Sequence, residues 1–215
     1  MKKSLKSNKF NKMEGNNSND HYDHEGSKMG MWLFIFTELL FFGGLFFVYA
    51  ISRYKNETAF ALAAEELNVT TGAINTIILL ISSATIAMAV SAIQLKKKNI
   101  TLIFLAITLI LAVVFLVNKY FEWGAKIEHG IYPGSEILQQ LGYGEILYFG
   151  LYFAMTGLHA LHIIVGIVII LIISVKVYNE KIHAERFVQL ENTGLYWHLV
   201  DIIWIFLFPL FYLIV

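Results

Sequence analysis

A long apolar stretch near the N-terminus, residues 29–52, most constrains how this chain can fold. A helix needs about 20 apolar residues, each rising about 1.5 Å, to cross the ~30 Å hydrocarbon core of a bilayer. The stretch exceeds this length and contains one acidic residue, Glu38. We therefore predict a transmembrane helix that carries a carboxyl group at membrane depth.

Four further stretches are long and apolar enough to cross a bilayer, at residues 73–95, 100–122, 145–175 and 195–215. The composition agrees with this interpretation, because 57% of the residues are hydrophobic and 15% are charged. We therefore predict an all-α, polytopic membrane domain at residues 29–215, a bundle of five transmembrane helices. Residues 1–28 are polar and basic, and we expect them to form a tail.

Two local features indicate which helices are neighbours. The second and third stretches are separated only by residues 96–99, so these two helices are expected to be antiparallel and adjacent. The second stretch also contains small hydroxyl residues, among them Thr76, Ser82 and Ser83. Such residues let helices approach closely and form hydrogen bonds across their interface.

The basic residues are distributed unevenly between the two predicted sides of the membrane. The tail, the turn at 96–98 and the loop at 176–193 together carry 12 Lys and Arg residues, whereas the opposite side carries 4. Cytoplasmic segments are enriched in Lys and Arg. The charge distribution therefore predicts that the N-terminus lies inside and the C-terminus outside.

Glu38 is expensive to place in a membrane. An acidic residue at the centre of a transmembrane helix costs about 2.5–3.5 kcal/mol on insertion scales, so Glu38 is expected to face protein or water rather than lipid. One interpretation is a structural acid, kept neutral by burial and hydrogen-bonded to a neighbouring helix. The other is a proton-handling group. The sequence leaves both interpretations open.

Metal binding has little support in the sequence. The chain has 0 Cys, which excludes disulfides, iron–sulfur clusters and thiolate metal sites. His159 and His162 share a helix face near mid-membrane, but a metal site would need further ligands. We favour two interior histidines that bond to Glu38 or to hydroxyl groups. Because the first and fourth helices enter the membrane from opposite sides, we predict a contact between Glu38 and a histidine.

Three further ionisable residues complete the expected intramembrane polar network. His198 and Asp201 share a face at the start of the fifth stretch, and we expect Asp201 to form an ion pair that fixes this helix to the bundle. Glu122 and its neighbour Lys119 lie at the outer end of the third stretch, where long side chains can extend toward the interface. We assign no catalytic and no metal-binding residue.

Several of these stretches together resemble subunit III of the haem–copper cytochrome c oxidases. They are Gly30-Met-Trp-Leu-Phe with Thr37-Glu38, Asn75-Thr76 with Ser82-Ser83, Lys119-Tyr120-Phe121-Glu122, Thr156-Gly-Leu-His159-Ala-Leu-His162 with Gly166, and Tyr196-Trp-His198-Leu-Val-Asp201-Ile-Ile-Trp204. The resemblance covers about residues 24–215. Larger family members have seven helices, and this chain resembles the short bacterial form that lacks the first two. That form implies a multi-pass protein of the bacterial inner (plasma) membrane.

The resemblance implies an accessory, non-catalytic role in a respiratory terminal oxidase that reduces oxygen to water and pumps protons. Family members bind no haem or copper, which are held by partner subunits. They contact subunit I directly, assemble with subunit II and bind phospholipid in a cleft. They support proton uptake and the stability of the catalytic subunit, and the acid that matches Glu38 is the family's carbodiimide-reactive carboxylate. Membership of a larger respiratory supercomplex is a further expectation, and no nucleic acid partner is expected.

Other functions stay open at this point. The nearest alternatives are subunit III of a quinol oxidase and the related accessory subunit of a nitric oxide reductase. A membrane b-type cytochrome could use His159 or His162 with His198 as haem ligands. A proton-coupled carrier centred on Glu38 is a fourth interpretation. The first two differ from the leading interpretation in their redox partners, whereas the last two would be independent of any oxidase.

Overall fold

The chain folds into helices joined by short connections. The computed structural model describes residues 24–214, and within this part there are seven helices and no strand. The all-α prediction is therefore confirmed, as is the prediction of five helices that are long and apolar enough to cross a membrane. Residues 1–23, most of the predicted tail, lie outside the described residues.

The five long helices are extended at most of their ends relative to the predicted stretches. They are α2 (His24–Lys55), α4 (Val69–Gln94), α5 (Lys98–Glu128), α7 (Tyr143–Tyr178) and α8 (Val188–Tyr212). Two short helices, α3 (Glu57–Glu65) and α6 (Glu136–Gln140), follow α2 and α5. The largest extension is at the start of α8, which begins at Val188 rather than at residue 195, because hydropathy marks only the apolar part of a helix that continues beyond it.

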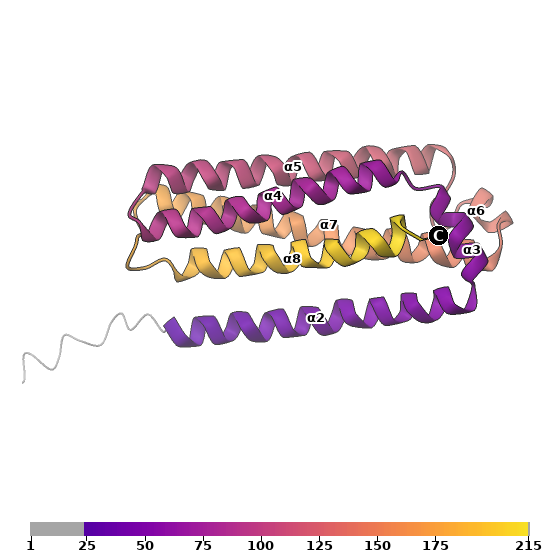
Figure 1. Cartoon of the computed structure of the whole chain (residues 1–215), viewed down its shortest axis with the longest axis horizontal. Helices are drawn as coiled ribbons and strands as arrows, with labels where there is room; N and C mark the ends of the chain where they lie inside the picture. The colour runs from indigo at the N-terminus through magenta and orange to yellow at the C-terminus, as the bar shows by residue number, and fades with distance from the viewer. Residues whose placement is uncertain (1–23, 215) are drawn as a thin grey trace, which may run out of the picture.

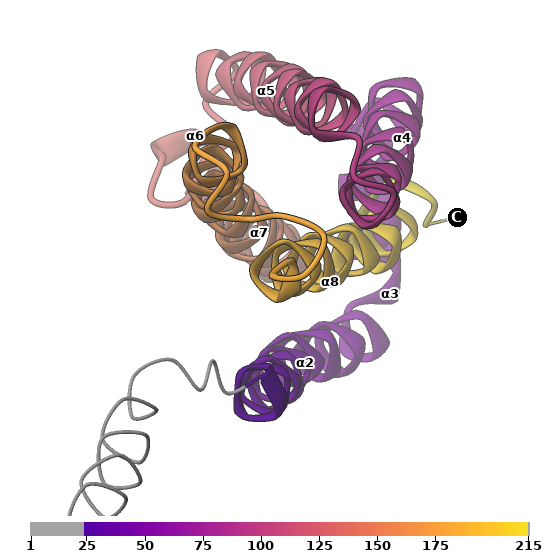
Figure 2. The ribbon, with the colours of Figure 1, turned by 90° about the vertical axis from the view of Figure 1, so that its left-hand side faces the viewer.

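Four of the long helices form a bundle, and the fifth lies against one side of it. Helices α4, α5, α7 and α8 surround a common core, with α4 beside α5 as predicted (Figure 2). Helix α2 runs along α8 and α7 outside this bundle (Figures 1 and 2). The short helices α3 and α6 lie together at one end of the molecule, which we call the α3–α6 end (Figure 1). The opposite end, with the α4–α5 turn and the α7–α8 loop, is called the turn end.

Helices α4 and α7 end in the same way at the turn end. Lys96 and Glu180 are the second residues after these helices, and both have a positive φ of 59°. This conformation is expected where paired backbone hydrogen bonds close the end of a helix. Lys98 and Glu180 form an ion pair of 2.9 Å that connects the two turns. The hydrogen bond from the Lys98 ammonium holds the pKa of the Glu180 carboxyl below its ordinary value.

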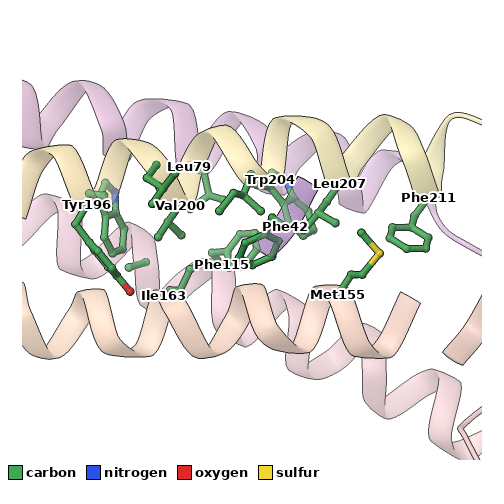
Figure 3. Packing of buried hydrophobic residues seen from close by; sticks show 14 of the residues in the cluster. Phe42, Leu79, Phe115, Met155, Ile163, Tyr196, Val200, Trp204, Leu207 and Phe211 are labelled. Carbon is green, nitrogen blue, oxygen red and sulfur yellow. The ribbon is translucent and has the colours of Figure 1, made fainter. Parts of the chain in front are cut away.

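The bundle core is rich in aromatic side chains, and α8 contributes its largest members. Figure 3 shows Phe42 of α2, Phe115 of α5 and Trp204 of α8 gathered in the interior. Trp197 and Trp204 are both fully buried. Their indole N–H groups donate hydrogen bonds of 3.0 Å to the hydroxyls of Ser82 and Thr76, respectively. The predicted role of the hydroxyl residues of α4 in binding a neighbouring helix is therefore confirmed.

Helix α2 is attached to the bundle near both of its ends. At the turn end, Lys28 forms an ion pair of 3.0 Å with Glu191, and the side-chain amide of Asn192 donates to Ser27. Near the α3–α6 end, the Tyr49 hydroxyl donates to the backbone carbonyl of Leu210. Of the 18 most apolar consecutive residues of α2, only 11% are buried, compared with 56% for α8. The middle of α2 is therefore mostly exposed, and its contacts with the bundle there come from one face that carries Glu38 and Phe42.

Gly166 makes the close approach of α7 and α8 testable. A Cβ atom at this position would lie 2.7 Å from the ring of Trp197, which is buried and cannot move freely. We expect Gly166→Ala to lower the free energy of unfolding by about 1–3 kcal/mol, the usual cost of overpacking a core. Gly150→Ala on the same helix is the matched control, because nothing lies within 4 Å of its added methyl group. Unfolding in detergent micelles measures both variants, and equal stabilities would contradict the proposed contact.

Candidate functional site

Glu38 and His162 form the predicted contact between α2 and α7. The Nε2 atom of His162 lies 3.2 Å from Oε2 of Glu38, and the two side chains are 17% and 19% exposed. The other ring nitrogen of His162, Nδ1, lies 2.8 Å from the backbone carbonyl of Leu158. A carbonyl oxygen can only accept, so Nδ1 carries a hydrogen and donates it.

This arrangement places a single proton between Glu38 and His162. With Nδ1 protonated, a neutral His162 ring presents an acceptor at Nε2, so Glu38 must be protonated to donate to it. If instead the ring carries a proton on both nitrogens, Glu38 is the accepting carboxylate. A hydrogen bond between the two side chains therefore requires one proton, carried either by Glu38 or by Nε2 of His162.

Surrounding residues fix the orientation of His162. The Tyr196 hydroxyl donates a 2.9 Å hydrogen bond to the backbone carbonyl of His162. The ring of Phe42 packs edge-on against the imidazole, with 5.4 Å between the two ring centres. Both contacts come from neighbouring helices, α8 and α2. The Tyr196 contact ties the α7 backbone at His162 to α8. The imidazole itself is held by Phe42 and by the bond of Nδ1 to Leu158, with Nε2 facing Glu38.

A cleft between α2 and the bundle leads to this pair. The cleft has a volume of about 490 Å³, and Glu38 and His162 are part of its lining. The other lining residues include Met31, Phe34 and Val165, while Asn192 and Thr193 line it toward the turn end. Glu38 thus faces a histidine and a cleft, in agreement with the expectation that it avoids bare lipid.

The expectation that both histidines of α7 would bond to Glu38 or to hydroxyls is wrong for His159. His159 is fully buried in the bundle, neither of its ring nitrogens has a hydrogen bond, and its ring lies 5.2 Å from Trp204 and 5.7 Å from Phe115. Positions i and i+3 differ by about 60° around a helix. That difference is enough for His162 to face α2 while His159 faces α5 and α8.

A second polar cluster, which we call the Lys119 cluster, consists of Lys119, Glu122, Tyr152 and Tyr212. The ammonium of Lys119 donates to Oε1 of Glu122 at 3.2 Å, to the Tyr152 hydroxyl at 3.1 Å and to the Tyr212 hydroxyl at 2.9 Å. Both tyrosine hydroxyls donate in turn to the same Glu122 oxygen, Tyr152 at 2.5 Å. The cluster therefore connects α5, α7 and α8 through one carboxylate oxygen.

The prediction that Lys119 extends toward the interface is wrong. Only 2% of Lys119 is exposed, and its ammonium lies 5.0–5.6 Å from the ring centres of Tyr152, Trp204 and Tyr212. Helix α5 continues to Glu128, so Lys119 lies about 13 Å inside the helix end. Sequence reasoning missed both tyrosines, because a tyrosine in an apolar stretch resembles an ordinary core or interface residue.

The predicted ion pair of Asp201 is also absent from the described part of the chain. His198 bonds to Ser83 of α4 instead, with 2.6 Å between Nδ1 and the hydroxyl oxygen. Asp201 is 3% exposed, and neither oxygen of its carboxyl has a hydrogen-bond partner among the described residues. No Lys, Arg or His side chain among residues 24–214 pairs with Asp201. The i, i+3 spacing was correct, but α4 supplies a closer partner for the histidine.

The ionisable residues do not converge on a metal site. Within residues 24–214, no group of three or more His, Cys, Asp or Glu side chains is arranged to hold a metal ion. His159, His162 and His198 have different surroundings: the aromatic core, Glu38 and Ser83, respectively.

Removal of Lys119 should reveal how strongly the Lys119 cluster is coupled. We expect Lys119→Met to lower the free energy of unfolding by about 3–5 kcal/mol, because it leaves the buried Glu122 carboxylate without its cation. The double variant Lys119→Met/Glu122→Gln should recover most of this loss. Lys28→Met is the control, since it breaks the half-exposed pair with Glu191 and should cost less than about 1 kcal/mol. Unfolding in detergent measures all three, and a small effect of Lys119→Met would contradict a buried ion pair.

Asp201 should respond differently, because no cation depends on it. A buried carboxyl without a cationic partner favours its neutral form, which an amide closely resembles. We expect Asp201→Asn to change the free energy of unfolding by less than about 1 kcal/mol. The same unfolding assay measures this change, and a loss comparable to that of Lys119→Met would indicate a charged, paired aspartate.

Comparisons with known proteins show which family the sequence matches. Residues 11–214 match the family described as cytochrome c oxidase subunit III. A protein of Aeropyrum pernix named haem–copper oxidase subunit I+III is 32% identical over 195 residues, which cover 87% of this chain. The chain spans only 22% of the length of that relative.

Two staphylococcal relatives match over nearly their full lengths. The probable quinol oxidase subunit 3 of Staphylococcus saprophyticus is 30% identical, and the match covers 92% of this chain and 94% of the relative. The protein of the same name in Staphylococcus aureus is 28% identical over the same shares of both chains. From the family match and these relatives, we conclude that the chain belongs to the cytochrome c oxidase subunit III family.

Proposed function

We propose that this chain is an accessory, non-catalytic subunit that supports proton uptake and the stability of the catalytic subunit. Family membership makes it a subunit III of a haem–copper oxidase. The observation that carries the finer proposal is the Glu38–His162 pair, which holds one proton in a cleft between α2 and the bundle. A group of this kind can take up and release a proton without redox chemistry.

The position of the cleft suits proton uptake from the inner side. From Glu38, the cleft extends toward the turn end, where Asn192 and Thr193 line it. The turn end carries the lysines of residues 96–98, and the excess of basic residues supports an inner location for it. In this orientation, the N-terminus lies inside, the C-terminus outside, and the cleft faces the cytoplasm of a bacterial cell with the protein in its plasma membrane.

The oxidase partners would hold the redox groups. Subunit I is the proposed direct partner, and the name of the Aeropyrum relative, which joins subunits I and III, supports this contact. Subunit II and a larger supercomplex are further proposed partners, and haem and copper would be bound in partner subunits. In this chain, the proposed work is limited to proton handling and to support of the complex.

Bound phospholipid is part of the proposal. A second groove of about 290 Å³ shares Ile169, Asn192 and Thr193 with the Glu38 cleft and reaches Lys176 and Gln189 at the turn end. Lys176 donates a 2.9 Å hydrogen bond to Gln189 and provides a cation at headgroup level. An acyl chain along Ile172 and Ile173 of this second groove, with its phosphate near Lys176, would fit this arrangement and leave the Glu38 cleft open.

The electron donor of the complex is a separate question, and quinol is the second candidate. The support is the name of the staphylococcal relatives, which are described as probable quinol oxidase subunits. Oxygen consumption by the purified complex with a quinol and with reduced cytochrome c distinguishes the two donors.

Purification of the native complex through a tag on this chain tests the main proposal. We expect a haem–copper partner to be recovered with the chain, with the optical spectrum of its haems, and no oxygen reduction by the chain alone. Oxygen reduction by the isolated chain would overturn the accessory role. Recovery without any haem-containing partner would overturn the assignment to an oxidase complex.

Glu38→Gln tests the proton-sharing pair within the complex. The amide preserves the shape of the side chain but cannot release a proton, so we expect normal assembly and haem content with slower proton uptake during turnover. Proton uptake is measured with a pH-sensitive dye in the reconstituted complex. Glu180→Gln is the control, because Glu180 is an exposed carboxyl at the turn end. Unchanged proton uptake in Glu38→Gln would leave Glu38 with a structural role only.

A further inference from the structure

The Lys119 cluster has no part in the function proposed above, and one of its atoms lacks a partner. Oε1 of Glu122 accepts hydrogen bonds from Lys119, Tyr152 and Tyr212. Oε2 of the same carboxyl is buried and accepts none, although the Glu122 side chain is only 7% exposed. Buried polar atoms nearly always have a hydrogen-bond partner. The free oxygen therefore indicates a donor that the described residues do not provide.

An unpaired donor lies in the same region. Asn75 of α4 is fully buried, and its carbonyl oxygen accepts a 2.8 Å hydrogen bond from the amide of Asn118. The remaining amide nitrogen of Asn75 has no acceptor. Glu122 thus has one unpaired acceptor, and Asn75 has one unpaired donor. Water can satisfy both, because it donates and accepts.

A polar pocket lies beside these atoms at the α3–α6 end. It has a volume of about 350 Å³, and its polar lining consists of Glu66, Asn68, Thr71, Asn118, Glu122 and Lys126. The side chain of Glu66 is 60% exposed, whereas that of Glu122 is 7% exposed. The pocket therefore extends from an exposed rim to a buried carboxyl. A polar cavity of this size can hold several water molecules.

We propose that this pocket is a hydrated vestibule in which water from the aqueous phase at the α3–α6 end donates to the free oxygen of Glu122. The buried Lys119–Glu122 ion pair is then in contact with water from one end of the subunit, separate from Glu38. In the proposed orientation this end faces the outside. The vestibule itself does not depend on that orientation.

Water in the vestibule would complete the hydrogen bonding of the buried carboxylate. Oε1 of Glu122 keeps the hydrogen bonds from Lys119, Tyr152 and Tyr212, while a water molecule donates to Oε2. The ion pair is thereby hydrated from one side without being broken.

The charged and titratable groups around the pair come from every helix packed against it. Glu66, in the α3–α4 connection, and Lys126, on α5, form an ion pair of 3.6 Å at the rim. Tyr152 and Tyr212 face the pair from α7 and α8, and His159 of α7 lies close enough for Lys119 to act on its charge.

The Lys119 cluster is separated from Glu38 by aromatic packing. His159 lies between the two sites but has no hydrogen bond, and its ring is enclosed by Phe115 and Trp204. Among residues 24–214, no chain of hydrogen bonds joins Glu122 to His162. The two polar sites are therefore not linked by hydrogen bonds in the part of the chain that the structure describes.

Substituted cysteines test whether the vestibule is hydrated, and the natural chain offers a clean background because it has 0 Cys. In membrane vesicles that contain the assembled complex, a charged, membrane-impermeant thiosulfonate is added to one side and then to the other. We expect Asn118→Cys to react. Val117→Cys is the matched control on the same helix, since Val117 is an exposed apolar residue that faces lipid, and should not react. Glu65→Cys, at the surface end of α3, should react as the positive control.

The labelling outcomes separate the vestibule from the orientation. An unreactive Asn118→Cys beside a reactive Glu65→Cys would overturn the proposal. If Asn118→Cys does not assemble, Thr71→Cys, which lines the same pocket, takes its place. Reaction of Asn118→Cys and Glu65→Cys from the cytoplasmic side would correct the orientation and leave the vestibule in place.

Discussion

Lipid offers no polar partners, so the ionisable side chains of the membrane-spanning helices lie where the protein encloses or pairs them, and this constraint governs the structure. Glu38 of α2 meets His162 of α7, and Lys119 meets Glu122 on its own helix together with tyrosines of α7 and α8. These contacts join helices that are far apart in the sequence. Polar side chains thereby determine which helix faces meet, while apolar side chains fill the space between them.

Helix α8 is the element on which these contacts depend. Its two buried tryptophans bind hydroxyls of α4, Trp204 also covers both His159 and the Lys119 ammonium, and Tyr212 completes the cluster around Glu122. The helix is the most buried of the five long helices. Helix α2 is the least buried and is fixed near its ends, which leaves room for the cleft beside Glu38.

The two polar sites differ in what they can do. The Glu38–His162 pair lies in a cleft that extends toward the turn end, whereas the Lys119 cluster adjoins a pocket at the α3–α6 end. An aromatic layer that includes Phe115 and Trp204 separates them. The two sites therefore open toward opposite ends of the molecule, and no chain of hydrogen bonds joins them among residues 24–214.

Sequence alone determined the five helices, the adjacency of α4 and α5 and the contact of Glu38 with a histidine, because length, hydropathy and a short connection are local properties. It could not determine the depth of Lys119, the direction of His159 or the missing partner of Asp201. Each of these depends on how a helix is rotated against its neighbours and on where it ends. Packing in the bundle decides both, since a face that is equivalent in sequence becomes core, cleft or lipid surface only when the other helices are in place.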